Sequence, residues 1–191
     1  MNFQDEAREL AEILAELEGA VGPAFSRARE AVCRSLQAGG KVLVFGNGGS
    51  AAQAQHFAAE LVNKFAAMRP AIRAVALTTD TSILTSVGND LAFDQVFSRQ
   101  VEALADRGDV ALALSTSGVS ANVLYAVQTA KRMGLTTVGF TGRNGGPLAG
   151  EVDHWLAVPS DRTPRIQEAH LFLLHRLALE VESYLFIPRR R

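Results

Sequence analysis

The sequence has a single cysteine, Cys33, among its 191 residues, which excludes an intrachain disulfide and fits a reducing compartment. An excess of charge is also lacking, because 19 basic and 20 acidic side chains leave a net charge of −1. That balance argues against a surface that binds nucleic acid. No segment approaches the roughly 20 apolar residues of a membrane span, and the first residues lack the apolar centre of a signal peptide. We therefore expect a cytoplasmic protein that binds neither nucleic acid nor membrane.

The composition is that of one folded domain. Hydrophobic residues make up 48% of the chain and charged residues 20%, which is enough to bury a core. We expect a single domain over residues 1–191, in which helices over residues 1–38 serve oligomer packing and residues 41–185 form the core. Cys33 is expected to be a small buried residue. The three closing arginines, residues 189–191, are interpreted as a solvated tail.

Hydrophobic periodicity predicts helices at both ends of the chain. Apolar residues at three- and four-residue steps predict a helix over residues 3–21, and Gly22 and Pro23 are expected to separate it from a second helix over residues 25–38. The narrow apolar seam of the first helix suits packing on a helix of another subunit. A last helix is predicted from Thr163, its N-cap, to about Tyr184. It is apolar nearly all round, which again indicates burial in an oligomer.

Five short apolar segments alternate with helical patterns. Strands are predicted over residues 41–45, 74–77, 110–114, 136–140 and 154–158. The intervening helices are predicted over residues 51–65, 82–87, 93–105 and 121–133. This alternation is typical of a three-layer α/β fold with a doubly wound parallel sheet. With the common flavodoxin-like strand order 2-1-3-4-5, a crevice lies at the topological switch between the first and third strands.

Loops of small residues follow the two strands that border this crevice. They cover residues 46–50, with Ser50 as the expected N-cap of the next helix, and residues 115–120. Backbone N–H groups and hydroxyls at such helix starts bind phosphate. Neither loop contains Lys or Arg, so this is not a Walker A nucleotide site, and the glycine spacing does not match the dinucleotide fingerprint G-x-G-x-x-G. One such loop means little, since serine caps helices commonly, but two at one crevice favour a phosphate monoester.

The helix after the first loop carries a stripe of polar groups that can move protons. Gln53, His56, Glu60 and Lys64 recur at three- and four-residue spacings and are expected to share one face. For an isolated helix the simpler interpretation is the solvated face of an amphipathic helix. The stripe begins one turn beyond the expected phosphate site, and that place in the chain favours a role in catalysis.

The last helix carries Gln167, Glu168, His170 and His175. Gln167 and His175 lie about 80° apart round the helix and ~12 Å apart along it, so they reach one site only by leaning towards each other. A histidine in an apolar helix is more often a hydrogen-bonded core residue than a catalyst. A carboxylate and an imidazole beside a sugar phosphate nevertheless suit proton transfer between carbons. The four side chains of His56, Glu60, Gln167 and His175 also form a mixed nitrogen and oxygen donor set that suits a metal such as zinc.

Five motifs in order closely resemble the bacterial phosphoheptose isomerase family, whose members have a sugar-isomerase (SIS) domain. The motifs are GNGGS at residues 46–50, QHFAAEL at 55–61, VGND at 87–90, STSGVSAN at 115–122 and RIQEAH at 165–170. The resemblance spans nearly the whole chain. It implies a homotetramer with shared active sites that converts sedoheptulose 7-phosphate to D-glycero-D-manno-heptose 7-phosphate through an enediol. That reaction is the first step of ADP-heptose or GDP-heptose formation.

The same resemblance implies roles for individual residues. Glu60 is expected to be the base and His175 the acid, and some family members hold zinc at positions matching His56, Glu60, Gln167 and His175. The phosphate is expected to contact Ser50, Ser115, Thr116, Ser117 and Ser120, and the sugar is expected to contact Asn47, Asp90 and Gln167. Gly48, Gly49 and Lys64 are also expected to contact substrate or its phosphate. Three residues depart from the family pattern: Lys64 stands for a frequent Arg, Val119 for a common Asn, and Pro164 for an Asp found in some members. These departures concern substrate affinity more than reaction type.

Two other functions fit the same sequence features. A non-enzymatic SIS-domain relative binds the bacterial replication initiator as a tetrameric scaffold, and residues 51–52, 55–59 and 77–80 resemble it too. A scaffold has no need of an acid and a base, however, and this chain retains both Glu60 and His175. The third function is an isomerase or sensor of another phosphosugar, which differs in pocket size.

Overall fold

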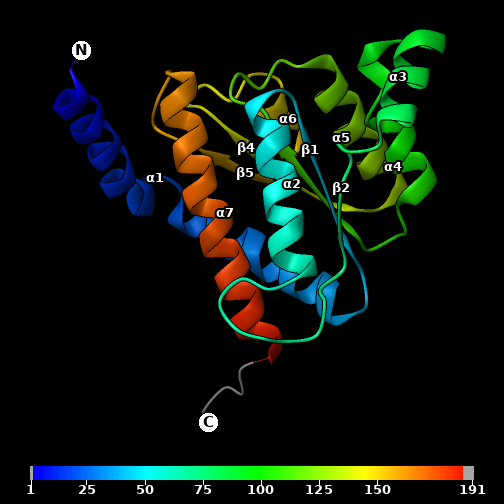
Figure 1. The fold of residues 1–191 in the computed structure, drawn as a ribbon, viewed down its shortest axis with the longest axis horizontal. Coiled ribbons are helices and arrows are strands. Elements are labelled where there is room, and N and C mark those ends of the chain that lie inside the picture. Colours follow the sequence, from blue (N-terminus) through cyan, green and yellow to red (C-terminus); the bar gives the residue numbers. More distant parts are fainter. Residues whose placement is uncertain (1, 187–191) are drawn as a thin grey trace.

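A computed structural model describes residues 2–186, so the predicted tail at residues 189–191 lies outside the described part of the chain. Five parallel strands form one sheet in the order β2-β1-β3-β4-β5, which confirms the predicted fold class and strand order (Figure 1). The strands are β1 (Val42–Gly46), β2 (Ala74–Ala76), β3 (Val110–Leu114), β4 (Thr136–Thr141) and β5 (His154–Ala157). The helices are α1 (Phe3–Gln37), α2 (Gly49–Val62), α3 (Thr81–Asp90), the 3₁₀ helix η1 (Phe93–Gln95), α4 (Ser98–Leu104), α5 (Ala121–Met133), α6 (Leu148–Glu151) and α7 (Thr163–Phe186).

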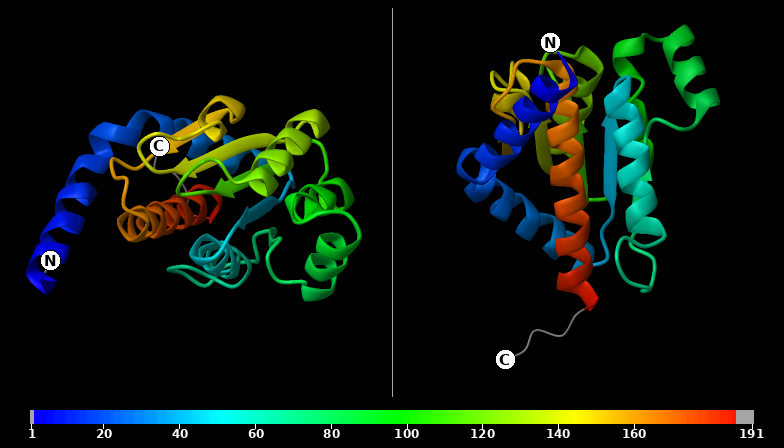
Figure 2. Two further views of the ribbon diagram at one scale, coloured as in Figure 1. Left: turned by 90° about the horizontal axis from the view of Figure 1, so that it is seen from above. Right: turned by 60° about the vertical axis from the view of Figure 1, so that its left-hand side comes forward.

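Helices cover both faces of the sheet and so give the molecule three layers (Figure 2). One core cluster joins α1, α2 and α7 to strand residues such as Val44 and Leu112. A second joins α4, α5 and α6 to strand residues of the opposite parity, such as Phe45 and Ala113. Every residue of β1 and β3 is buried, because neither face of these central strands reaches water. This is why both strands are continuous apolar runs in the sequence.

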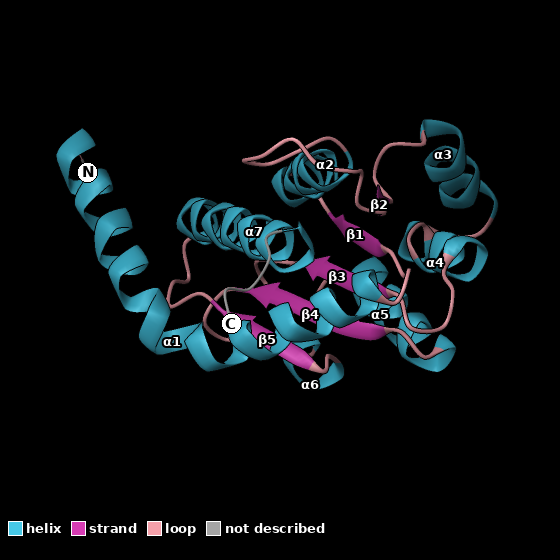
Figure 3. Cartoon of the chain, turned by 90° about the horizontal axis from the view of Figure 1, so that it is seen from below, coloured by secondary structure: helices cyan, strands magenta, loops and turns pink. Residues whose placement is uncertain are grey.

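The N-terminal helix α1 is a single helix of 35 residues, so the predicted break at Gly22 and Pro23 is wrong. Proline lacks the N–H that bonds to the carbonyl four residues earlier, and inside a helix it causes a kink or a break. Figure 3 shows that α1 changes direction along its length. The helix continues because residues on both sides of Pro23 are buried, namely Ile13, Leu17, Val21, Ala28, Val32 and Cys33. The burial of Cys33 agrees with the sequence prediction.

Helix α2 differs from its predicted bounds at both ends. It begins at Gly49, and its N-cap is Gly48, whose φ of 55° is in the left-handed region, so Ser50 is not the N-cap. It ends at Val62 rather than at residue 65, and Lys64 therefore lies beyond the helix instead of on its polar stripe. The backbone N–H groups that follow donate to the carboxylate of Glu182 on α7. A contact between residues so far apart leaves no local signal in the sequence.

Three smaller differences concern short helices. α3 continues through Gly88, which was expected to end it, and is capped by Asp80, whose side chain accepts the N–H of Ile83 at 2.9 Å. The helix predicted over residues 93–105 is divided into η1 and α4. The four-residue helix α6 was not predicted. Across residues 2–186, no helix combines the length and the apolar character that crossing a bilayer requires.

Candidate functional site

The loops after β1 and β3 lie side by side, because these strands are neighbours in the sheet. The strand ends approach so closely that a Cβ on Gly46 would lie 2.6 Å from the carbonyl oxygen of Leu114. Between the loops is a cavity of about 250 Å³. Its lining residues are Asn47, Gly48, Gly49, Ser50, Leu114, Ser115, Thr116, Ser117, Ser120, Thr163 and Gln167. The structure thus brings together nine of the eleven residues predicted to contact substrate, all except Lys64 and Asp90.

The two loops are held in register by a pair of amides. Asn47 and Asn122 exchange two side-chain hydrogen bonds, each of 2.9 Å, so the loop after β1 is tied to the first turn of α5. Asn122 is buried and was not singled out from the sequence, where it was only part of a motif. The Asn47 side chain, which was predicted to contact the sugar, is engaged by this pair.

The lining of the cavity offers hydroxyl and N–H groups and no cationic side chain. α2 and α5 both begin at its edge, so their first backbone N–H groups lie nearby with the positive end of each helix dipole. Gly118 has a φ of 68°, and a Cβ there would lie 1.9 Å from the carbonyl oxygen of Gly145, so only glycine fits. The arrangement suits a phosphate group that is bound by hydrogen bonds rather than by lysine or arginine.

Gln167 links α7 to this loop region. A Cβ on Gly49 would lie 2.6 Å from Nε2 of Gln167, so the amide lies directly against the start of α2. The backbone carbonyl of Gln167 accepts a hydrogen bond of 2.6 Å from Nε2 of Gln53. α2 and α7 are therefore linked by direct contacts next to the cavity. Thr163, at the start of α7, also lines the cavity, although the sequence suggested only a capping role for it.

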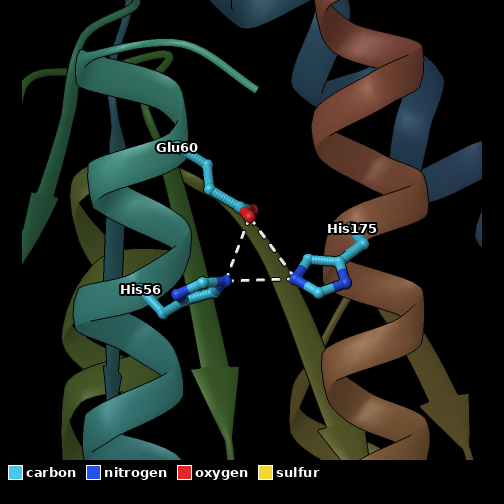
Figure 4. A group of neighbouring side chains, drawn as sticks. All are labelled: His56, Glu60 and His175. Carbon is cyan, nitrogen blue, oxygen red and sulfur yellow. Dashed lines mark hydrogen bonds and ion pairs between the residues drawn. The ribbon is translucent and has the colours of Figure 1, made fainter. Parts of the chain in front are cut away.

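Farther along the same two helices, His56, Glu60 and His175 converge (Figure 4). Nε2 of His56 lies 3.0 Å from Oε1 of Glu60 and 3.0 Å from Nε2 of His175, and Nε2 of His175 lies 3.3 Å from the same Glu60 oxygen. His56 and Glu60 meet because they are one turn apart on α2. His175 reaches them from α7, as the polar stripes in the sequence suggested. The packing of Phe65 on the His175 ring, with centroids 5.6 Å apart, was not foreseen.

The trio fits a metal ion by the chemistry of its donors. Two imidazole nitrogens and a carboxylate oxygen are common zinc ligands, and bonds of 2.0–2.1 Å in a tetrahedron place ligand atoms about 3.3 Å apart. The three observed separations of 3.0, 3.0 and 3.3 Å are close to this value. The second carboxylate oxygen of Glu60, Oε2, is buried and has no hydrogen-bond partner within residues 2–186. An oxygen in that state is available to a ligand or a proton.

Other polar residues lie apart from the trio. Asp90 ends α3, on the far side of β2 from α7, and accepts a hydrogen bond from its neighbour Asn89 (Figure 1). Lys64 is exposed in the segment after α2. His170 is fully buried on α7, with Nε2 3.2 Å from the carbonyl oxygen of Thr141, and burial lowers its pKa to about 4. His170 is thus the hydrogen-bonded core histidine that helix composition suggested.

Known proteins are similar to this chain in both sequence and fold. The SIS domain family model matches residues 4–142. The chain is 53% identical over 175 residues to the phosphoheptose isomerase of Paramagnetospirillum magneticum, an alignment that covers 92% of this chain and 91% of the relative. Solved phosphoheptose isomerases from Neisseria gonorrhoeae and Francisella tularensis align with TM-scores of 0.89 and 0.90 at 44% and 38% identity. These alignments cover 94% and 96% of this chain and 96% and 100% of theirs, respectively.

Proposed function

The chain belongs to the phosphoheptose isomerases of the SIS-domain family, and we propose that it converts sedoheptulose 7-phosphate to D-glycero-D-manno-heptose 7-phosphate in the cytoplasm. The observation that carries the proposal is the placement of a carboxylate and an imidazole on the helices that flank a hydroxyl-lined cavity. Family membership makes the protein an isomerase. The identity of the substrate, the reaction route and the catalytic roles of individual residues are our assignment.

The proposed reaction moves one hydrogen between neighbouring carbons. The Glu60 carboxylate removes a proton from C1 of the ketose while His175 donates a proton to the C2 carbonyl oxygen, so that an enediol forms. Glu60 then returns its proton to C2 and His175 recovers one from the C1 hydroxyl, which leaves an aldehyde at C1. No proton or electron is gained or lost overall. The 3.3 Å between Glu60 Oε1 and His175 Nε2 supports this pairing, since both groups reach the same pair of substrate atoms.

The length of the substrate follows from the spacing on α2. Ser50 lines the loop cavity, and Glu60 is ten residues later, which is ~15 Å of helix rise. The Glu60 side chain shortens this span because helical side chains lean towards the N-terminus. A long sugar phosphate bridges the distance from phosphate to reacting carbon, whereas a triose phosphate is too short. This supports a long-chain sugar phosphate, such as a heptose phosphate, over a triose phosphate.

We propose that the trio of His56, Glu60 and His175 holds zinc, with Gln167 as a further ligand, in a form of the site distinct from the metal-free one in which His175 Nε2 donates a proton. When bound, zinc polarises a carbonyl oxygen. The donor spacing and the orphaned Glu60 Oε2 support the three-residue part of this assignment. Gln167 lies against Gly49 beside the cavity, on the same helix as His175.

We also propose a homotetramer with shared active sites. A groove of about 410 Å³ runs between α1 and α7 and contains apolar residues such as Leu14, Phe25 and Phe172. Asp90 does not line the cavity of its own chain, so a contact between Asp90 and substrate is assigned to a neighbouring subunit. The alternative of a scaffold for the replication initiator is disfavoured by the isomerase relatives and by the retained Glu60 and His175.

Replacement of the base tests the proposed function. We expect wild-type protein to convert sedoheptulose 7-phosphate to an aldose phosphate, and Glu60→Gln to lower kcat by about a thousandfold with an unchanged melting temperature. Glu16→Gln, the same chemical change at an exposed position of α1, is expected to leave kcat unchanged. Full activity in Glu60→Gln would remove the proposed base. Binding of the initiator by a wild-type protein without turnover would favour the scaffold, and metal content measured by mass spectrometry tests the zinc assignment.

A further inference from the structure

The segment that follows α2 is held to α7 by a buried carboxylate. Glu182 accepts hydrogen bonds from the backbone N–H groups of Phe65, Ala66 and Ala67, at 3.1, 3.2 and 2.8 Å. It also accepts one from Nε of Arg69 at 3.1 Å. The side chains of Arg69 and Glu182 are only 2% and 4% exposed, so this pair is shielded from water. Figure 1 shows the segment passing across the lower part of α7 on its way to β2.

Arg69 uses its remaining N–H groups on the end of α2. Its Nη2 donates to the carbonyl oxygen of Glu60 at 2.7 Å, and its Nη1 donates to that of Leu61 at 2.6 Å. The last carbonyl groups of a helix have no partner within the helix, and a cation there also opposes the negative end of the dipole. One guanidinium therefore caps α2 at the residue that carries the proposed base.

The same contacts extend to the proposed acid. Phe65, whose N–H is bound by Glu182, packs its ring on the imidazole of His175. Glu182 follows His175 by seven residues on α7, so both lie on one face of that helix. The Arg69–Glu182 pair is thus bonded to the main chain of Glu60 on one side and supports His175 on the other.

We propose that Arg69 and Glu182 are positioning residues for the isomerase reaction, which they serve by fixing α2 and α7 at the separation that brings Glu60 to His175. This inference rests on the proposed function, because it takes Glu60 and His175 as base and acid. Neither positioning residue touches the cavity. Misplacement of reacting groups by about 1 Å costs up to a hundredfold in rate, so loss of the pair is expected to lower kcat while phosphate binding persists.

A second buried pair provides a matched control at the opposite end of the sheet. Asp109 accepts the backbone N–H groups of Lys41 and Asp106, at 2.9 and 2.8 Å, and pairs with Nζ of Lys41 at 2.6 Å. Lys41 and Asp109 directly precede β1 and β3, whereas the candidate site follows the carboxyl ends of these strands. Loss of the Asp109 charge therefore weakens the fold without touching the segment after α2.

The experiment compares Glu182→Gln, Arg69→Lys and Asp109→Asn in the full chain. We expect the first two to lower kcat by ten- to a hundredfold with KM within twofold of wild type. Asp109→Asn is expected to lower the melting temperature to a similar degree while kcat stays within twofold. Because the chain has only four histidines, labelled histidine also gives resolvable NMR signals. Those of His56 and His175 are expected to shift in Glu182→Gln and to stay unchanged in Asp109→Asn.

Two results would overturn the proposal. The first is a kcat within twofold of wild type in the Glu182 and Arg69 variants, and the second is an equal loss of kcat in Asp109→Asn. Arg69→Lys retains a charge opposite Glu182. If Glu182→Gln does not fold, the kcat and histidine signals of Arg69→Lys therefore decide the proposal. A wild-type protein without isomerase activity would count against the proposed function instead, and the histidine signals would still decide whether the pair positions His175.

Discussion

At the scale of single residues, His170 has an environment that couples folding to pH. Its ring packs edge-on against Phe140, with centroids 5.7 Å apart, and is fully buried. Burial lowers its pKa to about 4, from the ordinary value of 6.5. As the pH falls from 6.5 to 4, the unfolded chain therefore takes up a proton before the folded protein does. The contribution of the neutral ring to the free energy of unfolding is therefore fully present above pH 6.5, and it is lost as the pH falls from 6.5 to 4.

We expect this loss to be measurable by urea unfolding at fixed protein concentration. Between pH 7 and pH 5, the free energy of unfolding of wild type is expected to fall by about 2 kcal/mol more than that of His170→Gln. The variant lacks a titrating group at this position, so it isolates the contribution of His170 from those of surface carboxylates. Equal pH dependence in the two proteins would contradict the prediction.

Gly49 is a residue whose lack of a side chain serves the site. A Cβ at this position would lie 2.6 Å from Nε2 and 2.8 Å from Oε1 of Gln167, so Gly49→Ala must displace that amide. We expect a loss of roughly tenfold in kcat/KM with little loss of stability. Gly150→Ala is the matched control, because a Cβ there meets no atom within 4 Å. Unchanged kinetics in Gly49→Ala would show that the reaction does not depend on the position of the Gln167 amide.

At the scale of elements, α1 shows how backbone conformation decides the effect of one methyl group. Gly19 lies within the helix and Gly39 just beyond it, and a Cβ on either would meet no atom within 4 Å. Their backbones differ, since Gly39 has a φ of 90°. We expect Gly19→Ala to raise the free energy of unfolding by about 0.5–1 kcal/mol, because alanine favours the helix. Gly39→Ala is expected to lower it by about 1 kcal/mol.

Chemical denaturation of both variants checks this pair of predictions. The two substitutions add the same group in open space, so any difference in sign comes from the backbone alone. Stabilisation by Gly39→Ala would mean that the end of α1 adopts a different conformation in solution.

At the scale of the whole molecule, the groove between α1 and α7 offers apolar surface that a second chain can cover. α7 presents Phe172, which is 43% exposed, to the groove it forms with α1. α3 has no buried residue at all and so contributes little to the core of its own chain. Both features are expected of a subunit that completes its packing in an oligomer.

We predict that light scattering will give the mass of a tetramer for wild type. Phe172→Glu is expected to reduce that mass, because a buried, unpaired carboxylate is costly in an interface. Tyr125→Glu is the control, since Tyr125 is similarly exposed on α5, which packs on the other face of the sheet. A wild-type monomer with full activity would remove both the tetramer and the shared active sites.

Much of the fold follows from the sequence because its signals are local. The five strands are recognisable as short apolar runs, and those of β1 and β3 are continuous because strands covered on both faces need apolar side chains at every position. The two loops that line the cavity are recognisable as small polar residues between a strand and a helix. His56 and Glu60 could be paired in advance, because helical periodicity alone places residues four apart side by side.

Tertiary structure decided what depends on residues distant in the chain. Pro23 bends α1 without ending it, because burial on both sides outweighs one lost hydrogen bond. α2 ends at Val62, because Glu182, more than a hundred residues away, binds the N–H groups that follow. The approach of His175 to Glu60, like the pairing of Asn47 with Asn122, exists only once α7 and α5 are docked on the sheet. Local pattern thus determined which elements form, and the packing between them determined where they end and which side chains meet.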